Sequence, residues 1–214
     1  MADNSLFEKL GRWLQKLLAL YVAVLGIEIL AAVVAIAALA GTAGTELSSG
    51  RLQLAGFSLM AMAYSAYAEV GAFVLIAILF LRFLYKAVQQ AKGFATPYAY
   101  ASAGWAVGYW FIPVVNLYRP FEVVKQLFKA CTQQAGGKPA AGEQLLSAWW
   151  AMFLVSNLAG WMLANSNNDF STTAGVLTYA EYSIGCNLLL MIATFLFWLV
   201  NKRLVTAMGS TVAR

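Results

Sequence analysis

Four long apolar segments constrain the fold of this chain more than any other feature. They run over roughly residues 17–40, 66–85, 145–164 and 182–201. An α-helix needs about 20 apolar residues to cross a hydrocarbon core of about 30 Å, so each segment is long enough for a transmembrane helix. The composition agrees, because 62% of the residues are hydrophobic and 11% are charged. We therefore expect an all-α integral membrane protein with a single membrane domain over residues 1–214.

The start of the second helix is the boundary that the sequence defines least. The stretch from Phe57 to Ala68 is also apolar, so this helix can begin before residue 66 and project beyond the bilayer. With a start near residue 66, Glu69 lies closer to the outer surface of the membrane than to its centre.

Basic residues indicate how the chain is oriented, because they accumulate in short loops on the cytoplasmic side of a membrane. With four crossings and both termini inside, 13 of the 14 basic residues are cytoplasmic and Arg51 alone is outside. A fifth crossing over residues 97–118 would leave six basic residues inside and eight outside, which matches no such bias. We therefore predict a multi-pass protein with a cytoplasmic N-terminus and C-terminus.

The segment between the second and third apolar stretches contains a helix that stops before it can cross. Thr96 can cap a helix that starts at Pro97, and Pro113 would end or kink it. The resulting half-helix over residues 97–111 is about 22 Å long at 1.5 Å per residue, which is short of a crossing. We expect this half-helix to be re-entrant or interfacial.

A second helix in the same segment is predicted over residues 120–134, and its pattern is amphipathic. Its lysines, Lys125 and Lys129, lie away from its apolar face. We expect the helix to lie on the inner leaflet, with both lysines near anionic lipid head groups. The residues that share the apolar face are Phe121, Val124, Leu127 and Cys131.

The same segment carries a family resemblance. The stretch "GWAVGYWFIPVVNLYRPFEVVKQLF", preceded by "FLRFLYKAVQQA", resembles the bacterial membrane proteins of domain of unknown function family 4328, which share a "W-A-V-G-W-W-F-x-P-x-x-N-L-x-x-P" element. Tyr109 replaces a family aromatic, and Tyr118 stands where tryptophan is common. The resemblance implies a multi-pass protein of the bacterial inner membrane. The family has no assigned activity, substrate or catalytic residue that could be transferred to this chain. The matching residues are Trp105, Ala106, Val107, Gly108, Trp110, Phe111, Pro113, Asn116, Leu117 and Pro120.

The half-helix is also the candidate interaction surface. Gly104 and Gly108 lie four residues apart and would form a smooth face for packing against the helix bundle, while the neighbouring aromatic residues suit the membrane interface. The candidate residues of this surface are Gly104, Trp105, Gly108, Trp110, Pro113, Asn116 and Pro120.

Glu28 is the one ionisable residue of the first apolar segment. It lies 12 residues after Lys16, which places it about 18 Å deep and near the middle of a bilayer. Asn157 and Asn187 are expected at a comparable depth in the third and fourth helices. The three residues form a candidate ligand or proton site, and the alternative is a protonated carboxyl that hydrogen-bonds to an asparagine and holds the helices together.

An enzymatic function is not indicated. The chain contains no histidine, which excludes histidine-ligated haem or zinc and a serine–histidine dyad. It also contains no phosphate-binding loop, no G-x-S-x-G and no C-x-x-C motif. We interpret Cys131 and Cys186 as packing residues, and we expect no catalytic residue, no metal and no cofactor.

Two classes of function remain open. The favoured one is a non-catalytic scaffold, accessory or regulatory membrane component whose half-helix binds a membrane-protein partner or a second copy of the chain. The alternative is a small proton- or solute-conducting channel or transporter that uses Glu28, because a mid-membrane carboxylate beside a broken helix is typical of transporter sites. Neither hypothesis involves nucleic acid.

Overall fold

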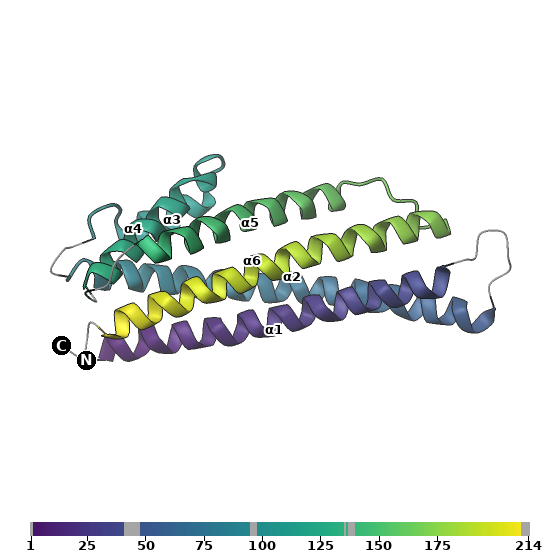
Figure 1. Ribbon diagram of the computed structural model, residues 1–214, viewed down its shortest axis with the longest axis horizontal. Coiled ribbons are helices and arrows are strands. Elements are labelled where there is room, and N and C mark those ends of the chain that lie inside the picture. The colour runs from purple at the N-terminus through teal and green to yellow at the C-terminus, as the bar shows by residue number, and fades with distance from the viewer. Residues whose placement is uncertain (1, 41–47, 95–97, 135, 137–139, 211–214) are drawn as a thin grey trace. The chain divides into compact units, whose positions relative to one another are not determined.

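The computed structural model describes residues 2–40, 48–94, 98–134, 136 and 140–210 (Figure 1). The described residues form helices joined by turns and loops, and they contain no strand. In chain order the helical elements are α1 (Ala2–Leu39), α2 (Ser49–Ala91), α3 (Ala103–Gly108), the short 3₁₀ helices η1 (Tyr109–Phe111) and η2 (Val115–Leu117), α4 (Arg119–Gln134), α5 (Ala140–Ala164) and α6 (Thr173–Ser210).

Four of these helices are long and apolar enough to cross a membrane, which confirms the predicted all-α class. The apolar spans are Phe7–Leu39, Ser49–Ala91, Gly142–Ala164 and Thr173–Gly209. The second helix begins at Ser49 rather than near residue 66. Its 43 residues correspond to about 64 Å, roughly twice the thickness of a hydrocarbon core.

The chain divides into two compact units, and each of the four long helices contributes residues to both. Unit 1 comprises residues 1–18, 74–151 and 195–214, and unit 2 comprises residues 19–73 and 152–194.

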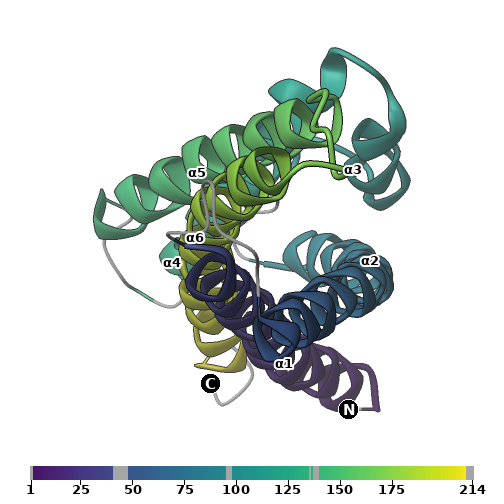
Figure 2. The same ribbon diagram turned by 90° about the vertical axis from the view of Figure 1, so that its right-hand side faces the viewer.

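Unit 2 is held together by small side chains where α1, α2 and α6 lie side by side (Figures 1 and 2). Such residues allow helix backbones to approach closely, which favours association within a membrane. Arg51, near the start of α2, donates hydrogen bonds to the carbonyl oxygens of Ala38 (3.0 Å) and Ala40 (2.7 Å), and it thereby satisfies the C-terminus of α1. The two buried clusters are Ala31, Ala32, Met62 and Ala180, and Ala38, Leu39, Ala55 and Val176.

Unit 1 has an aromatic core. The Phe80 ring of α2 makes edge-to-face contacts with Trp110 and Phe197, each with a centroid separation of 5.1 Å. Trp149 of α5 stacks on Phe197 at 5.0 Å, and the indole N–H of its neighbour Trp150 donates to the Leu117 carbonyl at 3.1 Å. These contacts fix the η1–η2 segment on α2, α5 and α6.

The predicted half-helix is shorter than expected. Its predicted cap and first residue, Thr96 and Pro97, lie outside the described residues, and residues 98–102 are not helical. Helix α3 starts at Ala103, where the side chain of Ser102 accepts a hydrogen bond from the Trp105 N–H at 3.2 Å. Helices α3 and η1 together span residues 103–111, about 13 Å at 1.5 Å per residue, which is too short to cross a membrane.

The face of α3 that packs within unit 1 is not the predicted glycine face. Ala103 and Ala106 are buried, whereas Gly104 is exposed and a Cβ placed on it would meet no atom within 4 Å. A Cβ on Gly108 would touch only the ring of Trp105 of the same helix, at 3.7 Å. After η1 the chain reverses at Pro113 and at Val114, whose φ is +66°.

Helix α4 occupies the segment expected for the amphipathic helix, and its apolar side is covered by protein. Val124, Leu127 and Cys131 are buried, and Phe121 is half-buried. Phe128 of the same helix packs so closely on Gly142 of α5 that a Cβ there would overlap its ring. The apolar side of α4 therefore stabilises unit 1 by contact with other helices.

Candidate functional site

The polar groups of unit 2 gather around Glu28 of α1. This side chain is 5% exposed, and the residues around it in α1 are apolar. Tyr21 lies seven residues earlier, two helical turns away on the same face, and is 4% exposed. Both residues belong to a helix that is apolar from Leu17 to Leu39 apart from these groups, so any partner must come from a neighbouring helix.

Glu69 of α2 is the first such partner. The hydroxyl of Tyr21 donates a hydrogen bond to Oε1 of Glu69 at 3.1 Å. Glu69 is half-buried, and Tyr67 on the same helix is exposed. The bond joins α1 to α2 inside the apolar part of unit 2.

Glu28 connects the same pair of helices to α6. Its carboxyl lies within reach of the side chains of Asn187 of α6 and of Glu69, and Asn187 is 5% exposed. Oε2 of Glu28 is buried and has no hydrogen-bond partner among the described residues. Tyr179 of α6 is half-buried and lies near both carboxyl groups. We call Tyr21, Glu28, Glu69 and Asn187 the carboxyl cluster.

A hydrogen bond between two carboxyl groups requires a proton on one of them, because an ionised carboxylate can only accept. Two adjacent negative charges among apolar helices would also repel each other strongly. The arrangement therefore places two carboxyl groups close together in apolar surroundings and leaves one buried oxygen, Oε2 of Glu28, without a partner among the described residues.

The structure brings together two of the three residues predicted for this site. Asn187 lies beside Glu28. Asn157 does not, because it is exposed and its amide donates to the Phe153 carbonyl of its own helix at 2.7 Å. Tyr21 and Glu69 were not predicted as members of the site.

The predicted interaction surface separates into an exposed part and a packed part. Gly104, Trp105 and Pro113 are exposed, with Trp105 at 57%. Pro120 is buried, and Trp110 is half-buried between the rings of Phe80 and Trp150. Gly108 and Asn116 are half-buried. Several residues of the tryptophan-rich element thus form the core of unit 1.

The lysines predicted to face lipid make contacts within unit 1. Lys129 forms an ion pair with Glu143 of α5 at 3.3 Å, and the Lys125 ammonium lies 5.7 Å from the centroid of the Phe121 ring. Both lysines are half-buried.

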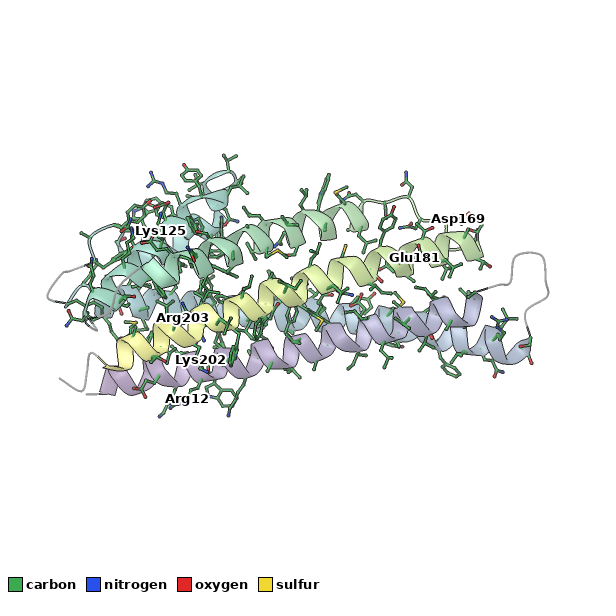
Figure 3. The ribbon with its side chains drawn as sticks, viewed as in Figure 1. Arg12, Lys125, Asp169, Glu181, Lys202 and Arg203 are labelled. Carbon is green, nitrogen blue, oxygen red and sulfur yellow. The ribbon has the colours of Figure 1, made fainter. Side chains whose placement is uncertain are left out.

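Charge is distributed unequally between the two units. Unit 1 contains 13 of the 14 basic residues, and Arg51 is the one basic residue in the sequence of unit 2. Unit 2 contains five of the nine acidic residues. Figure 3 labels basic residues of unit 1 and acidic residues of unit 2. The basic ones are Arg12, Lys125, Lys202 and Arg203, and the acidic ones are Asp169 and Glu181.

Four helices that are long and apolar enough to cross a membrane assign this chain to the class of multi-helix membrane proteins. It belongs to the family described as Domain of unknown function (DUF4328), whose model matches residues 44–206. The match includes Glu69, Asn187 and the tryptophan-rich element, whereas Tyr21 and Glu28 lie before it. Searches of curated proteins and of solved structures find no match.

Proposed function

We propose that this protein is a non-enzymatic, proton-coupled channel or transporter of the bacterial plasma membrane, and that the Glu28–Glu69 pair takes up and releases the proton. The observation that carries the proposal is the proximity of the buried Glu28 carboxyl of α1 to the Glu69 carboxyl of α2 in apolar surroundings. Ionisable residues inside membranes are costly and commonly mark ion or proton pathways.

A change of protonation at this pair would also change how the helices associate. Glu28 and its partners connect α1, α2 and α6, so loss of the shared proton breaks the carboxyl–carboxyl hydrogen bond and introduces repulsion between α1 and α2. The adjoining contacts of α1, α2 and α6 are made by small apolar residues such as Ala31, Ala32 and Ala180. These side chains have no polar group that could replace the lost hydrogen bond. Proton binding is therefore coupled to helix packing, which a proton-driven conformational change requires.

The distribution of basic residues supports the orientation that we propose. The helix ends in unit 1 carry nearly all the basic charge. In the proposed orientation they lie in the cytoplasm together with both termini, as the positive-inside rule favours. Helix α4 then lies at the inner leaflet. A single cysteine introduced by Ser48→Cys should react with an impermeant thiol reagent from outside, and one introduced by Gln133→Cys should react only after the membrane is permeabilised. Labelling of the Gln133→Cys variant from outside would overturn this orientation.

Proton flux into proteoliposomes tests the proposed activity. With a pH-sensitive dye inside and an imposed potential, the unaltered protein should acidify the lumen, and Glu28→Gln and Glu69→Gln should each abolish this flux because an amide cannot titrate. Glu181→Gln is the matched control, since Glu181 is an exposed carboxylate of α6 in the same unit and should have no effect. Flux that persists in both cluster variants would refute the proposal.

A non-catalytic scaffold is the second candidate, because the segment after α3 exposes several large apolar side chains. Phe111 and Val114 are 70% and 73% exposed, and Leu117 and Tyr118 are also exposed. Gly104→Leu tests this candidate, since a Cβ at this open position would meet no atom within 4 Å and we expect the fold to tolerate the change. A scaffold predicts that Gly104→Leu dissociates a membrane-protein partner or a second copy in native mass spectrometry, while Glu28→Gln leaves the assembly intact. An unchanged assembly in Gly104→Leu would eliminate it.

A further inference from the structure

A polar cleft in unit 1 is not used by the proposed proton function. It follows the end of α2 and has a volume of ≈ 510 Å³. A second opening of ≈ 640 Å³ shares Lys92 and Ser102 with it. Among the described residues that line these two openings, none is acidic. The polar and aromatic lining of the first is Lys92, Tyr98, Tyr100, Ser102, Trp105 and Tyr109.

The cleft has a positive and donor-rich lining. Lys92 is exposed. Arg119 contacts two of the lining tyrosines: its Nη1 donates a hydrogen bond to the Tyr100 hydroxyl at 2.7 Å, and its guanidinium carbon lies 5.9 Å from the Tyr109 ring centroid. The hydrogen bond to Tyr100 raises the pKa of Arg119, which keeps this group cationic. Burial and the neighbouring Tyr100 raise the pKa of Tyr98, so its hydroxyl stays neutral.

The Lys92 ammonium and the neutral hydroxyls of the lining, with Arg119 in contact with two of the lining tyrosines, suit a phosphate-type anion. Lys and Arg bind phosphate oxygens through charge-assisted hydrogen bonds, which are about twice as strong as neutral ones. A carboxylate in the lining would oppose such a ligand, and the described lining has none.

An apolar groove adjoins the polar openings. It has a volume of ≈ 510 Å³, and Tyr85 borders both this groove and the second polar opening. Its apolar walls are Leu10 of α1, Leu81 of α2 and Val107 of α3, and Arg82 and Lys86 also line it. Leu81 precedes Lys92 by 11 residues, about 17 Å along a helix. The polar openings and the groove together suit a ligand with an anionic head and an apolar tail.

We propose that an anionic phospholipid binds here, with its phosphate in the cleft beside Lys92 and one acyl chain along the Leu81–Val107 groove. The exposed ring of Trp105 lines the polar cleft, and tryptophan is enriched at membrane interfaces. The high basic content of unit 1 adds attraction for anionic lipid. The site is independent of the carboxyl cluster.

Native mass spectrometry of the full-length, delipidated protein in a mild detergent tests this site. The protein is titrated with phosphatidylglycerol, with phosphatidylcholine of the same chain length, and with glycerol 3-phosphate. We expect one phosphatidylglycerol to bind in preference to the other two. Lys92→Gln should weaken this binding about tenfold, the effect of losing one hydrogen bond to a charged group. Lys202→Gln is the matched control, because Lys202 is an exposed lysine of α6 that does not line the cleft.

Three results would overturn the proposal. Phosphatidylcholine bound as tightly as phosphatidylglycerol would show that the charge of the lipid is not recognised. Glycerol 3-phosphate bound as tightly would assign the cleft to a soluble phosphate compound. An equal effect of Lys92→Gln and Lys202→Gln would show that general surface charge, and not this cleft, attracts the lipid. Unchanged thermal unfolding of both variants, measured in parallel, establishes that each is folded.

Discussion

Replacement of Tyr21 by phenylalanine isolates one hydrogen bond of the carboxyl cluster. The tyrosine hydroxyl donates to Oε1 of Glu69 at 3.1 Å, and the side chain is 4% exposed. Phenylalanine keeps the ring and its packing, so no large cavity forms. The change therefore removes the contact between α1 and α2 while leaving the apolar surroundings in place.

The contribution of this hydrogen bond to stability can be judged from two kinds of measurement, one in soluble proteins and one in membrane proteins. Hydrogen bonds to charged groups contribute about 1.5–3 kcal/mol in soluble proteins. Hydrogen bonds between transmembrane helices average about 0.6 kcal/mol and reach about 1.7 kcal/mol, because the separated helices also find partners. Since the acceptor is a carboxyl group and the donor is buried, we expect Tyr21→Phe to cost about 1–1.7 kcal/mol, at the upper end of the membrane range.

A double-mutant cycle measures this bond directly. The unfolding free energy in a denaturing-detergent titration is compared for the unaltered protein, Tyr21→Phe, Glu69→Met and the double variant. Methionine removes the acceptor and keeps the side-chain length. We expect a coupling energy of about 1 kcal/mol between the two positions. Tyr64→Phe is the control, because Tyr64 is an exposed tyrosine of α2 and should change stability by less than about 0.5 kcal/mol. A cost of Tyr21→Phe that is the same in the unaltered background and in the Glu69→Met background would refute the reasoning.

Three further predictions concern unit 1 and the loop between α5 and α6. Gly142→Ala should destabilise the protein by about 1–3 kcal/mol in thermal unfolding, because its Cβ would overlap the Phe128 ring, whereas Gly104→Ala at an open position should be nearly neutral. Burial raises the pKa of the Cys131 thiol to about 12, so in a Cys186→Ala background a maleimide at pH 8 should modify Cys131 only after denaturation; labelling of this folded variant would contradict the buried position of Cys131. Hydrogen bonds from the Ser171 hydroxyl and N–H lower the pKa of Asp169; the stability that they add is present above the unfolded pKa of about 3.9 and is lost as the pH falls through the folded value. Ser171→Ala should raise this pKa in an NMR titration, and an unchanged pKa would exclude the hydroxyl as a cause.

The class of the fold could be predicted from the sequence, but the lengths of the helices could not. An apolar run defines the part of a helix that suits a bilayer, and it does not define where the helix ends. Helix α1 continues through Lys9, Arg12 and Lys16, since lysine and arginine are good helix formers. Helix α2 continues back to Ser49, because the stretch before residue 66 contains neither proline nor another strong helix breaker apart from Gly50 and Gly56.

The placement of α2 explains why Glu69 was missed. A helix that starts near residue 66 puts Glu69 at its outer end, whereas α2 has 20 residues before it. Glu69 precedes Arg82 by 13 residues, about 20 Å, and Glu28 follows Lys16 by 12 residues, about 18 Å. Counting from the inner basic residues of both helices would have placed the two carboxyl groups at one depth.

Depth along a helix does not determine which way a side chain faces. Asn157 and Asn187 were predicted at similar depths, but Asn187 faces Glu28 and Asn157 is exposed. The glycines of α3 show the same limitation. Gly104 and Gly108 share a face by spacing, and the packed face is that of Ala103 and Ala106. The missing information is the rotation of each helix, which depends on contacts that a single apolar segment does not encode.

Infrared difference spectroscopy of the carboxyl region tests the shared proton most directly. Spectra of the unaltered protein in bilayers at pH 7 are compared with those of Glu28→Gln and Glu69→Gln, and Glu181→Gln serves as the control. The hydrogen-bonded pair predicts one carbonyl band of a protonated carboxyl that disappears in both cluster variants and persists in the control. The absence of this band from the unaltered protein, or its persistence in both cluster variants, would contradict a proton held between Glu28 and Glu69.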